Sequence, residues 1–254
     1  MIVAGIDIGS RSIEVVLKEN GRVVHTQRAD TTYAPLSQCD KILSGLTFNR
    51  LVATGYGRKL LAQHRPAETI TEIQAYSLGA KVLFPGCRAI LDIGGQDTKA
   101  ISLNPDGSIL KFEMNDRCAA GTGKFLEFMA ASLQMRVEDF GRFALTGKTG
   151  IDINSMCTVF AESEATSLMA RGHKAEDIAL ALHQSVLKRS LTMLRRVGLR
   201  HPVVFAGGAA RNPCLVRLIN QTLAAEVLVP DAPDAVGALG AAVYGWRKFG
   251  DDRG

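Results

Sequence analysis

The sequence lacks any run of 18 or more apolar residues, and its opening segment, MIVAGIDIGSRS, has no basic flank before the apolar residues. A membrane-spanning helix needs about 20 apolar residues, and a secretory signal needs a basic N-terminal region. We therefore expect a cytoplasmic protein without a membrane partner. Aromatic residues are also scarce, at 6%, but 46% of the 254 residues are hydrophobic. This content is enough to bury a core, so disordered and collagen-like chains are excluded.

Cysteine and one-sided charge are limited as well. The five cysteines are an odd number without regular spacing, unlike the framework of a secreted disulfide-rich domain. We therefore expect them to be reduced thiols or metal ligands. The net charge of +5 is small and spread along the chain. The densest basic stretch, residues 187–201, has a helical spacing that is typical of a solvated face. We therefore expect no nucleic-acid partner.

The chain contains an internal duplication. Residues 4–24 (AGIDIGSRSIEVVLKENGRVV) and residues 89–110 (AILDIGGQDTKAISLNPDGSIL) align with Asp7 on Asp92. Each copy predicts an apolar strand, an Asp-Ile-Gly turn, a second strand, a polar turn containing glycine and the start of a third strand. We expect two similar α/β domains, over residues 1–88 and 89–235, and a C-terminal helix within residues 236–254 that packs back on the first domain.

The Asp-Ile-Gly turns have the composition of phosphate-binding loops. Glycine lets the backbone approach a phosphate, successive N–H groups form an anion-binding concavity, and the carboxylate of Asp7 or Asp92 can hold Mg²⁺ through water. A third turn, Gly207-Gly208, follows another predicted strand. One such turn would be typical of an ordinary β-turn, but three together favour a clamp on a nucleotide. The stretch AAGTGKF is not a Walker loop, because Phe125 stands where that loop requires Ser or Thr.

Two cysteines precede predicted helices in similar surroundings. Cys118 lies before GTGKFLEFMA, and Cys157 lies before TVFAESEATSLMA. Considered without further context, thiols at such positions are more often core or reactive residues than metal ligands. The other three cysteines, Cys39, Cys87 and Cys214, lack this setting, and we expect them to be small core residues.

The motifs DIGGQDTK, MNDRCAAGTGKFLE and CTVFAESE, with the turn VVFAGGAARN, carry a resemblance to known proteins. The chain resembles the acetate and sugar kinase, heat-shock chaperone and actin superfamily of ATPases. Within it, the chain is similar to the BadF/BadG/BcrA/BcrD ATPase family, the ATP-dependent activators of 2-hydroxyacyl-CoA dehydratases and benzoyl-CoA reductase type enzymes. The resemblance covers nearly the whole chain. It implies an α/β fold with two duplicated actin-like, ribonuclease H-like domains and a nucleotide cleft between them.

The resemblance also implies a mechanism. A homodimer would hold one 4Fe-4S cluster between its subunits, on Cys118 and Cys157 of each chain. ATP hydrolysis would drive a low-potential electron, supplied by a ferredoxin or flavodoxin, into a separate dehydratase or reductase. A cubane cluster takes four thiolates, so two cysteines per chain agree with a cluster on a two-fold axis. The helix N-termini would direct unpaired N–H groups toward the anionic cluster.

For the nucleotide site, the resemblance implies ATP or ADP with Mg²⁺. The implied binding residues are Gly9, Ser10, Arg11, Ser12, Gly94, Gly95, Gln96, Gly207 and Gly208. The residues implied in catalysis are Asp7, Asp92, Gln96 and Asp97, of which Gln96 and Asp97 are candidates for positioning the attacking water or Mg²⁺. One residue departs from the family pattern, because the first loop commonly ends in lysine and this chain has Glu14. The difference affects whether this side chain contacts a phosphate, but it does not affect the backbone contacts around it.

Two other functions fit the nucleotide loops. One is a small-molecule kinase of the same superfamily that phosphorylates a sugar-type hydroxyl, and the other is a nucleotide-gated interaction protein without redox chemistry. A kinase has no need for paired cysteines before helices, and filament-forming relatives usually carry insertions that this compact chain lacks. The leading prediction is therefore an ATP-hydrolysing iron-sulfur electron donor.

Overall fold

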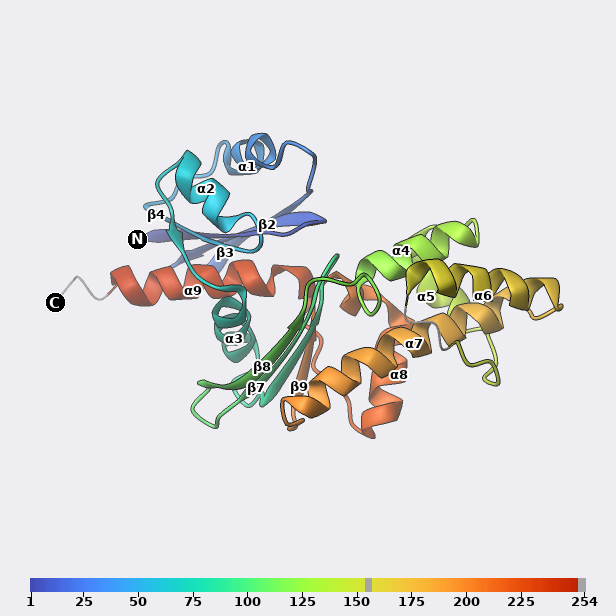
Figure 1. Ribbon diagram of the computed structural model, residues 1–254. Helices are drawn as coiled ribbons and strands as arrows, with labels where there is room; N and C mark the ends of the chain where they lie inside the picture. Colours follow the sequence, from blue (N-terminus) through green and yellow to red (C-terminus); the bar gives the residue numbers. More distant parts are fainter. Residues whose placement is uncertain (154–156, 251–254) are drawn as a thin grey trace.

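The computed structural model describes residues 1–153 and 157–250, which form two α/β lobes (Figure 1). The first lobe has a five-stranded sheet in the order β3-β2-β1-β4-β5. Its strands are β1 (Ile2–Ile8), β2 (Ser12–Glu19), β3 (Arg22–Asp30), β4 (Arg50–Thr54) and β5 (Glu68–Thr69). Strands β1 to β3 form an antiparallel meander, and β4 runs parallel to β1. Helices α1 (Pro35–Leu43) and α2 (Arg58–His64) cover one face of this sheet.

The second lobe repeats this topology. Its four strands, β6 (Ala89–Ile93), β7 (Thr98–Leu103), β8 (Ile109–Asn115) and β9 (Val203–Ala206), lie in the order β8-β7-β6-β9. Strands β6 to β8 form the antiparallel meander, and β9 runs parallel to β6. The central strands β1 and β6 are apolar along almost their whole length because both faces of each sheet are covered. The duplication in the sequence is therefore also a duplication in the sheet order.

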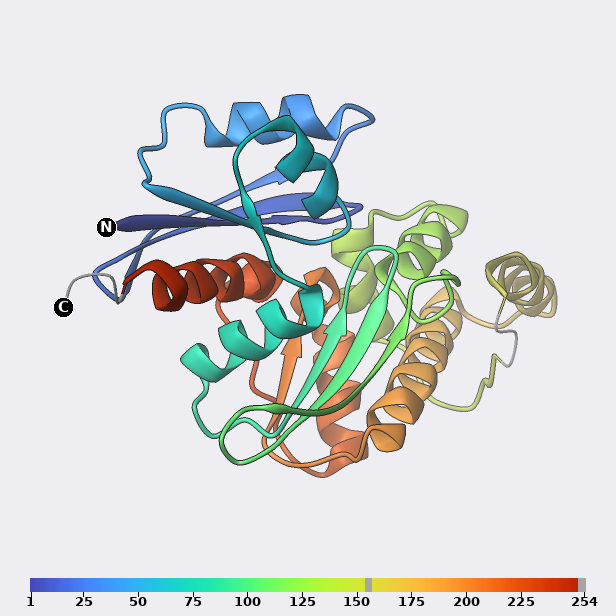
Figure 2. The same ribbon diagram turned by 60° about the vertical axis from the view of Figure 1, so that its left-hand side comes forward.

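Two helices pack against each other between the two sheets. Helix α3 (Glu72–Leu83) follows the strands of the first sheet in the sequence but packs on β6, β7 and β8 of the second. Helix α9 (Val236–Gly250) follows the strands of the second sheet but packs on β1, β2 and β4 of the first (Figure 2). Small residues allow this close approach, since a Cβ at Gly240 would overlap the carbonyl oxygen of Ala75. The two helices therefore form the joint between the lobes.

The remaining helices lie between β8 and α9 in the sequence. They are α4 (Gly123–Ser132), α5 (Val137–Ala144), α6 (Thr158–Ala170), α7 (Ala175–Arg196) and α8 (Pro213–Leu223), with short 3₁₀ helices η1 (Gly208–Arg211) and η2 (Pro233–Ala235). Helix α7 covers the second sheet and packs against α4, α5, α6 and α8. Helix α8 begins at Pro213, because the Asn212 side chain accepts hydrogen bonds from the amides of Cys214 and Leu215 and proline is favoured in the first turn.

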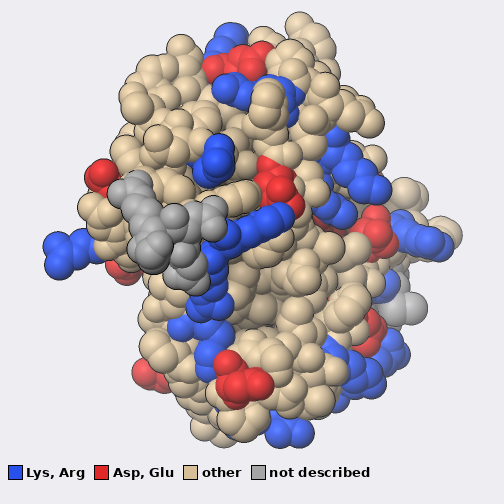
Figure 3. Space-filling view, turned by 90° about the vertical axis from the view of Figure 1, so that its left-hand side faces the viewer, with Lys and Arg blue, Asp and Glu red and all other residues tan. Residues whose placement is uncertain are grey.

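Residues 154–156, within the second cysteine motif, and residues 251–254, at the end of the predicted C-terminal segment, lie outside the described part of the chain. Among the described helices, none combines the length and the apolar character that a membrane span requires. Figure 3 shows the face that carries the N-terminus, where Lys and Arg side chains form a short stripe and are otherwise interspersed with Asp and Glu. An ion pair joins Lys248 Nζ, on α9, to Glu68 Oε1, on β5, at 2.7 Å.

Candidate functional site

A cavity of about 650 Å³ lies between the lobes, and both repeated loops line it. The structure brings together the predicted nucleotide and catalytic residues along its wall, namely Asp7, Gly9, Ser10, Arg11, Ser12, Asp92, Gly94, Gly95, Gln96, Asp97, Gly207 and Gly208. The same hydrogen bond closes both Asp-Ile-Gly turns, since the N–H of Gly9 donates to Ser12 O at 3.0 Å and the N–H of Gly94 donates to Asp97 O at 2.9 Å. The two copies thus present equivalent loops to one cavity.

Each repeated aspartate occupies a space that a glycine on the neighbouring strand leaves open. Asp7 lies near the end of β1, beside Gly55 at the end of β4, and Asp92 lies near the end of β6, beside Gly207 at the end of β9. Both glycines have a positive φ, of 86° and 82°, and a Cβ at either position would overlap the aspartate Oδ1. These glycines are therefore required for the position of the carboxylates as well as for the turns.

A buried lysine, which no sequence pattern assigns to the site, binds the two aspartates of the second loop. Lys99 lies opposite Asp92 in the β6–β7 register, and its Nζ is 2.9 Å from Asp92 Oδ2 and 3.0 Å from Glu72 Oε2. It also contacts Asp97. Burial by itself would lower the pKa of Lys99, but the three carboxylates outweigh it and raise that pKa well above the usual value. The lysine is therefore charged and fixes the aspartates of this loop.

The first loop has no such lysine, because Glu14 occupies the equivalent position opposite Asp7. Burial, followed by the charges of Glu14 and Glu72, raises the pKa of Asp7 well above its usual range. Burial is also the largest cause that raises the pKa of Glu14 to about 7. Two carboxylates therefore lie together where the second loop has a carboxylate and a lysine.

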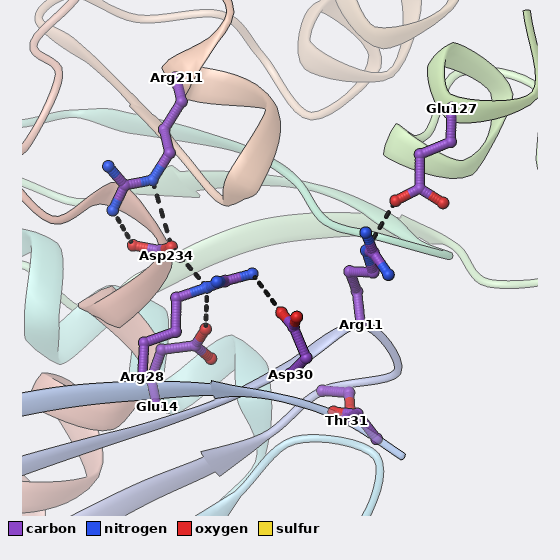
Figure 4. Close-up of polar contacts among 9 residues, drawn as sticks. Arg11, Glu14, Arg28, Asp30, Thr31, Glu127, Arg211 and Asp234 are labelled. Carbon is purple, nitrogen blue, oxygen red and sulfur yellow. Dashed lines mark hydrogen bonds and ion pairs between the residues drawn. The ribbon is translucent and has the colours of Figure 1, made fainter. Parts of the chain in front are cut away.

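A row of charged residues extends from Glu14 across the cleft (Figure 4). Arg28, opposite Glu14 on β3, places its Nε 3.5 Å from Glu14 Oε1 and 3.3 Å from Asp234 Oδ2. Arg211, just after the third glycine turn, binds the same aspartate with its Nη2 2.7 Å from Oδ1. No sequence pattern predicts that Arg28, Arg211 and Asp234 interact, since they come from three distant segments and only the fold brings them together.

The loop that bears Cys118 is attached to the turn that follows β6. The amides of Gly123 and Lys124, the first two residues of α4, donate to Gly94 O and Gly95 O, each at 2.8 Å. The Thr98 hydroxyl donates to Gly121 O at 2.7 Å, in the same loop. We predicted that the N-terminus of α4 directs unpaired N–H groups toward a cluster. This is wrong for these two amides, because they already donate hydrogen bonds to the glycine carbonyl oxygens.

The two predicted ligands differ from the other cysteines in exposure. Cys118 is partly buried in the loop before α4, Cys157 is exposed at the N-cap of α6, and neither lines the cavity between the lobes. Helices α4 and α6 pack against each other. The remaining three, Cys39, Cys87 and Cys214, are buried, and burial raises the pKa of each thiol. Within the described residues there is no cluster of three or more His, Cys, Asp or Glu able to hold a metal ion.

Known proteins are similar to this chain in both sequence and fold. The model of the BadF/BadG/BcrA/BcrD ATPase family matches residues 4–245. The 2-hydroxyisocaproyl-CoA dehydratase activator of Clostridioides difficile is 38% identical over 257 residues, which cover 98% of this chain and 96% of that protein.

Two solved structures superpose on the chain over nearly its full length. The activator of the 2-hydroxyisocaproyl-CoA dehydratase from Clostridium difficile, with bound ADPNP, has a TM-score of 0.89 at 38% identity and covers 98% of this chain and 95% of that one. The (R)-2-hydroxyglutaryl-CoA dehydratase component A of Acidaminococcus fermentans has a TM-score of 0.90 at 33% identity, with 98% of both chains covered. The predicted fold and the predicted resemblance are both confirmed, and the chain belongs to the BadF/BadG/BcrA/BcrD ATPase family.

Proposed function

We propose that this chain is an ATP-hydrolysing activator that delivers a low-potential electron to a separate dehydratase or reductase. The observation that carries the proposal is the attachment of α4, which follows Cys118, to the carbonyl oxygens of Gly94 and Gly95. A nucleotide that shifts the second phosphate loop therefore also shifts the segment that bears Cys118. The names of the relatives, which are dehydratase activators or components, and the ADPNP bound to one of them support the same function.

The aspartates of the cavity fit a nucleotide-bound Mg²⁺. Asp92 Oδ1 is buried without a hydrogen-bond partner, and the raised pKa of Asp7 reflects burial beside other carboxylates. A divalent cation would satisfy both groups, since it favours their ionised forms. In this proposal Asp7 and Asp92 hold Mg²⁺ through water, Gln96 and Asp97 orient the attacking water, and the glycine loops bind the phosphates of ATP or ADP.

The exposed thiols fit a 4Fe-4S cluster shared by two chains. Each chain offers Cys118 and Cys157 on neighbouring segments, and a cubane cluster needs four such thiolates. When bound, the cluster would supply one-electron transfer at low potential, with a ferredoxin or flavodoxin as the upstream donor. The first turn of α6 also exposes Val159 and Phe160, at 62% and 67%, next to Cys157. Apolar residues beside the ligands support a homodimer formed around the cluster.

The cluster assignment is tested by anaerobic purification followed by iron, sulfide and visible-absorption analysis. We expect about four iron atoms per dimer, and loss of the chromophore in Cys118→Ser and in Cys157→Ser. Cys87→Ala is the matched control, because Cys87 is buried, and it should keep its iron. Full iron content in both serine variants would refute the ligand assignment.

The nucleotide role is tested on the same preparations. Asp92→Asn should weaken Mg²⁺-dependent ATP hydrolysis, whereas Asp106→Asn, in the exposed turn after β7 of the same repeat, should not. Stopped-flow oxidation of the reduced protein by its partner should require hydrolysable ATP, and ADP should support it poorly. Equal rates with ATP, ADP and no nucleotide would refute an activator. ATP-dependent phosphorylation of a sugar in place of electron transfer would favour the kinase alternative.

A further inference from the structure

We propose that Arg11 is a coupling residue that exchanges between Glu127 on α4 and the terminal phosphate of the bound nucleotide. Nucleotide binding would then release α4 from the first lobe. This inference rests on the proposed function, in which the segment before α4 carries a cluster ligand, and it adds the side chains that connect the nucleotide to that segment.

The ion pair between Arg11 and Glu127 joins the two sides of the cleft. Arg11 belongs to the first phosphate loop, and its Nε lies 2.7 Å from Glu127 Oε1 (Figure 4). A Cβ built on Gly95 would lie 2.7 Å from the Cβ of Arg11, so the arginine passes directly over the second phosphate loop. Both Arg11 and Glu127 line the nucleotide cavity. A phosphate held between the two loops is therefore within the reach of the same guanidinium.

Helix α4 is connected to both lobes. Its first two amides are fixed to Gly94 and Gly95 of the second loop, and Glu127, one turn further along, is held by Arg11 of the first loop. When Arg11 releases Glu127, α4 loses this ion pair with the first lobe but keeps its hydrogen bonds to the second loop. Rotation of the lobes would then move α4 with the second loop alone.

The charges favour an exchange. The side chains of Arg11 and Glu127 are 54% and 22% exposed, and ion pairs in such surroundings are weak. A nucleotide phosphate offers Arg11 a more highly charged anion and a bidentate geometry. Glu127 would not be left without a cation, because Lys124 Nζ already lies 3.2 Å from its other carboxylate oxygen. Linkage then requires that weakening the ion pair strengthens nucleotide binding.

The test is a thermodynamic cycle on the affinity for ADPNP with Mg²⁺, measured by isothermal titration calorimetry without partner or reductant. We expect Glu127→Gln to tighten binding by about two- to fivefold, a change that matches the weakness of exposed ion pairs. Arg11→Gln should weaken binding, and the double variant should bind like Arg11→Gln, because Glu127 then has nothing to compete for. Glu68→Gln, which removes an exposed ion pair with Lys248, should leave affinity unchanged.

Two further measurements separate exchange from a structural role. The charge-reversed variant Arg11→Glu/Glu127→Arg keeps the ion pair but places an anion in the phosphate loop, so it should fold and lose ADPNP affinity. Hydrogen exchange over residues 123–132 should rise on ADPNP binding in the wild type and not in Arg11→Gln. Unchanged affinity in Glu127→Gln, or additive effects in the cycle, would overturn the inference and leave the proposed function intact. Absence of ADPNP binding by the wild type would overturn both.

Discussion

The buried carboxylates of Asp7, on β1, and Glu14, opposite it on β2, lead to a prediction about how stability depends on pH. In the folded protein the pKa of Glu14 is raised from 4.5 to about 7, chiefly by burial. The folded state therefore binds this proton more tightly than the unfolded chain does, and the free energy of unfolding must fall as pH rises between these two values. We expect Glu14→Gln to remove that dependence, because the amide has the same shape and no charge to bury.

The magnitude follows from the interval between the two pKa values. At about 1.36 kcal/mol for each pH unit, the interval from 4.5 to about 7 corresponds to about 3 kcal/mol. Glu14→Gln should therefore be as stable as the wild type near pH 4.5 and more stable by up to about 3 kcal/mol above pH 7. Arg28 is not left unpaired by the change, since it also contacts Asp30 and Asp234.

The assay is urea unfolding of both proteins at half-unit steps from pH 4.5 to 8, in chelator and without nucleotide, followed by far-ultraviolet circular dichroism. Glu19→Gln is the control, because it removes a carboxylate charge from a partly exposed position at the far end of the same strand. A difference between wild type and Glu14→Gln that stays constant across the pH range would refute the reasoning. So would a greater stability of the wild type at pH 8.

Three further substitutions test the rest of the site and the joint between the lobes. Glu14→Lys should keep or improve ADPNP affinity, because it places a cation opposite Asp7 as in the second repeat, and calorimetry that finds affinity lost would contradict this. Lys99→Met should lower the free energy of unfolding in urea by about 3–5 kcal/mol, since it leaves buried carboxylates unpaired. A cost below about 1 kcal/mol would show that the carboxylates around Lys99 are already neutral. Gly240→Val should destabilise the protein by at least about 1–3 kcal/mol, because any Cβ there overlaps the carbonyl of Ala75. Unchanged thermal unfolding of that variant would mean that the two helices can separate without loss.

Much of the fold could be predicted because the repeat is local. The pattern of strand, Asp-Ile-Gly turn and strand occurs twice, each time within about twenty residues, and the structure gives both copies the same strand order. Whole-motif matches predicted the family, which the comparisons confirm. Lys99 and Glu14 occupy equivalent positions in the two copies, so their contrast was visible in the aligned repeats. The role of Lys99 in holding Asp92 was nevertheless missed, because the alignment does not say which side chains face each other.

The sequence by itself determined the two repeated Asp-Ile-Gly loops that line the cleft, because turns, strand ends and helix caps depend on short-range backbone geometry. Tertiary structure alone decided which of these groups interact across the cleft. The contacts Arg11–Glu127 and Arg28–Asp234 join segments more than 100 residues apart, and neither pattern nor spacing predicts them. The hydrogen bonds from the first amides of α4 to Gly94 O and Gly95 O likewise form only because the fold packs α4 against that loop. The physical reason is that burial and charge pairing depend on how the lobes assemble, whereas turn and strand geometry depends on neighbouring residues.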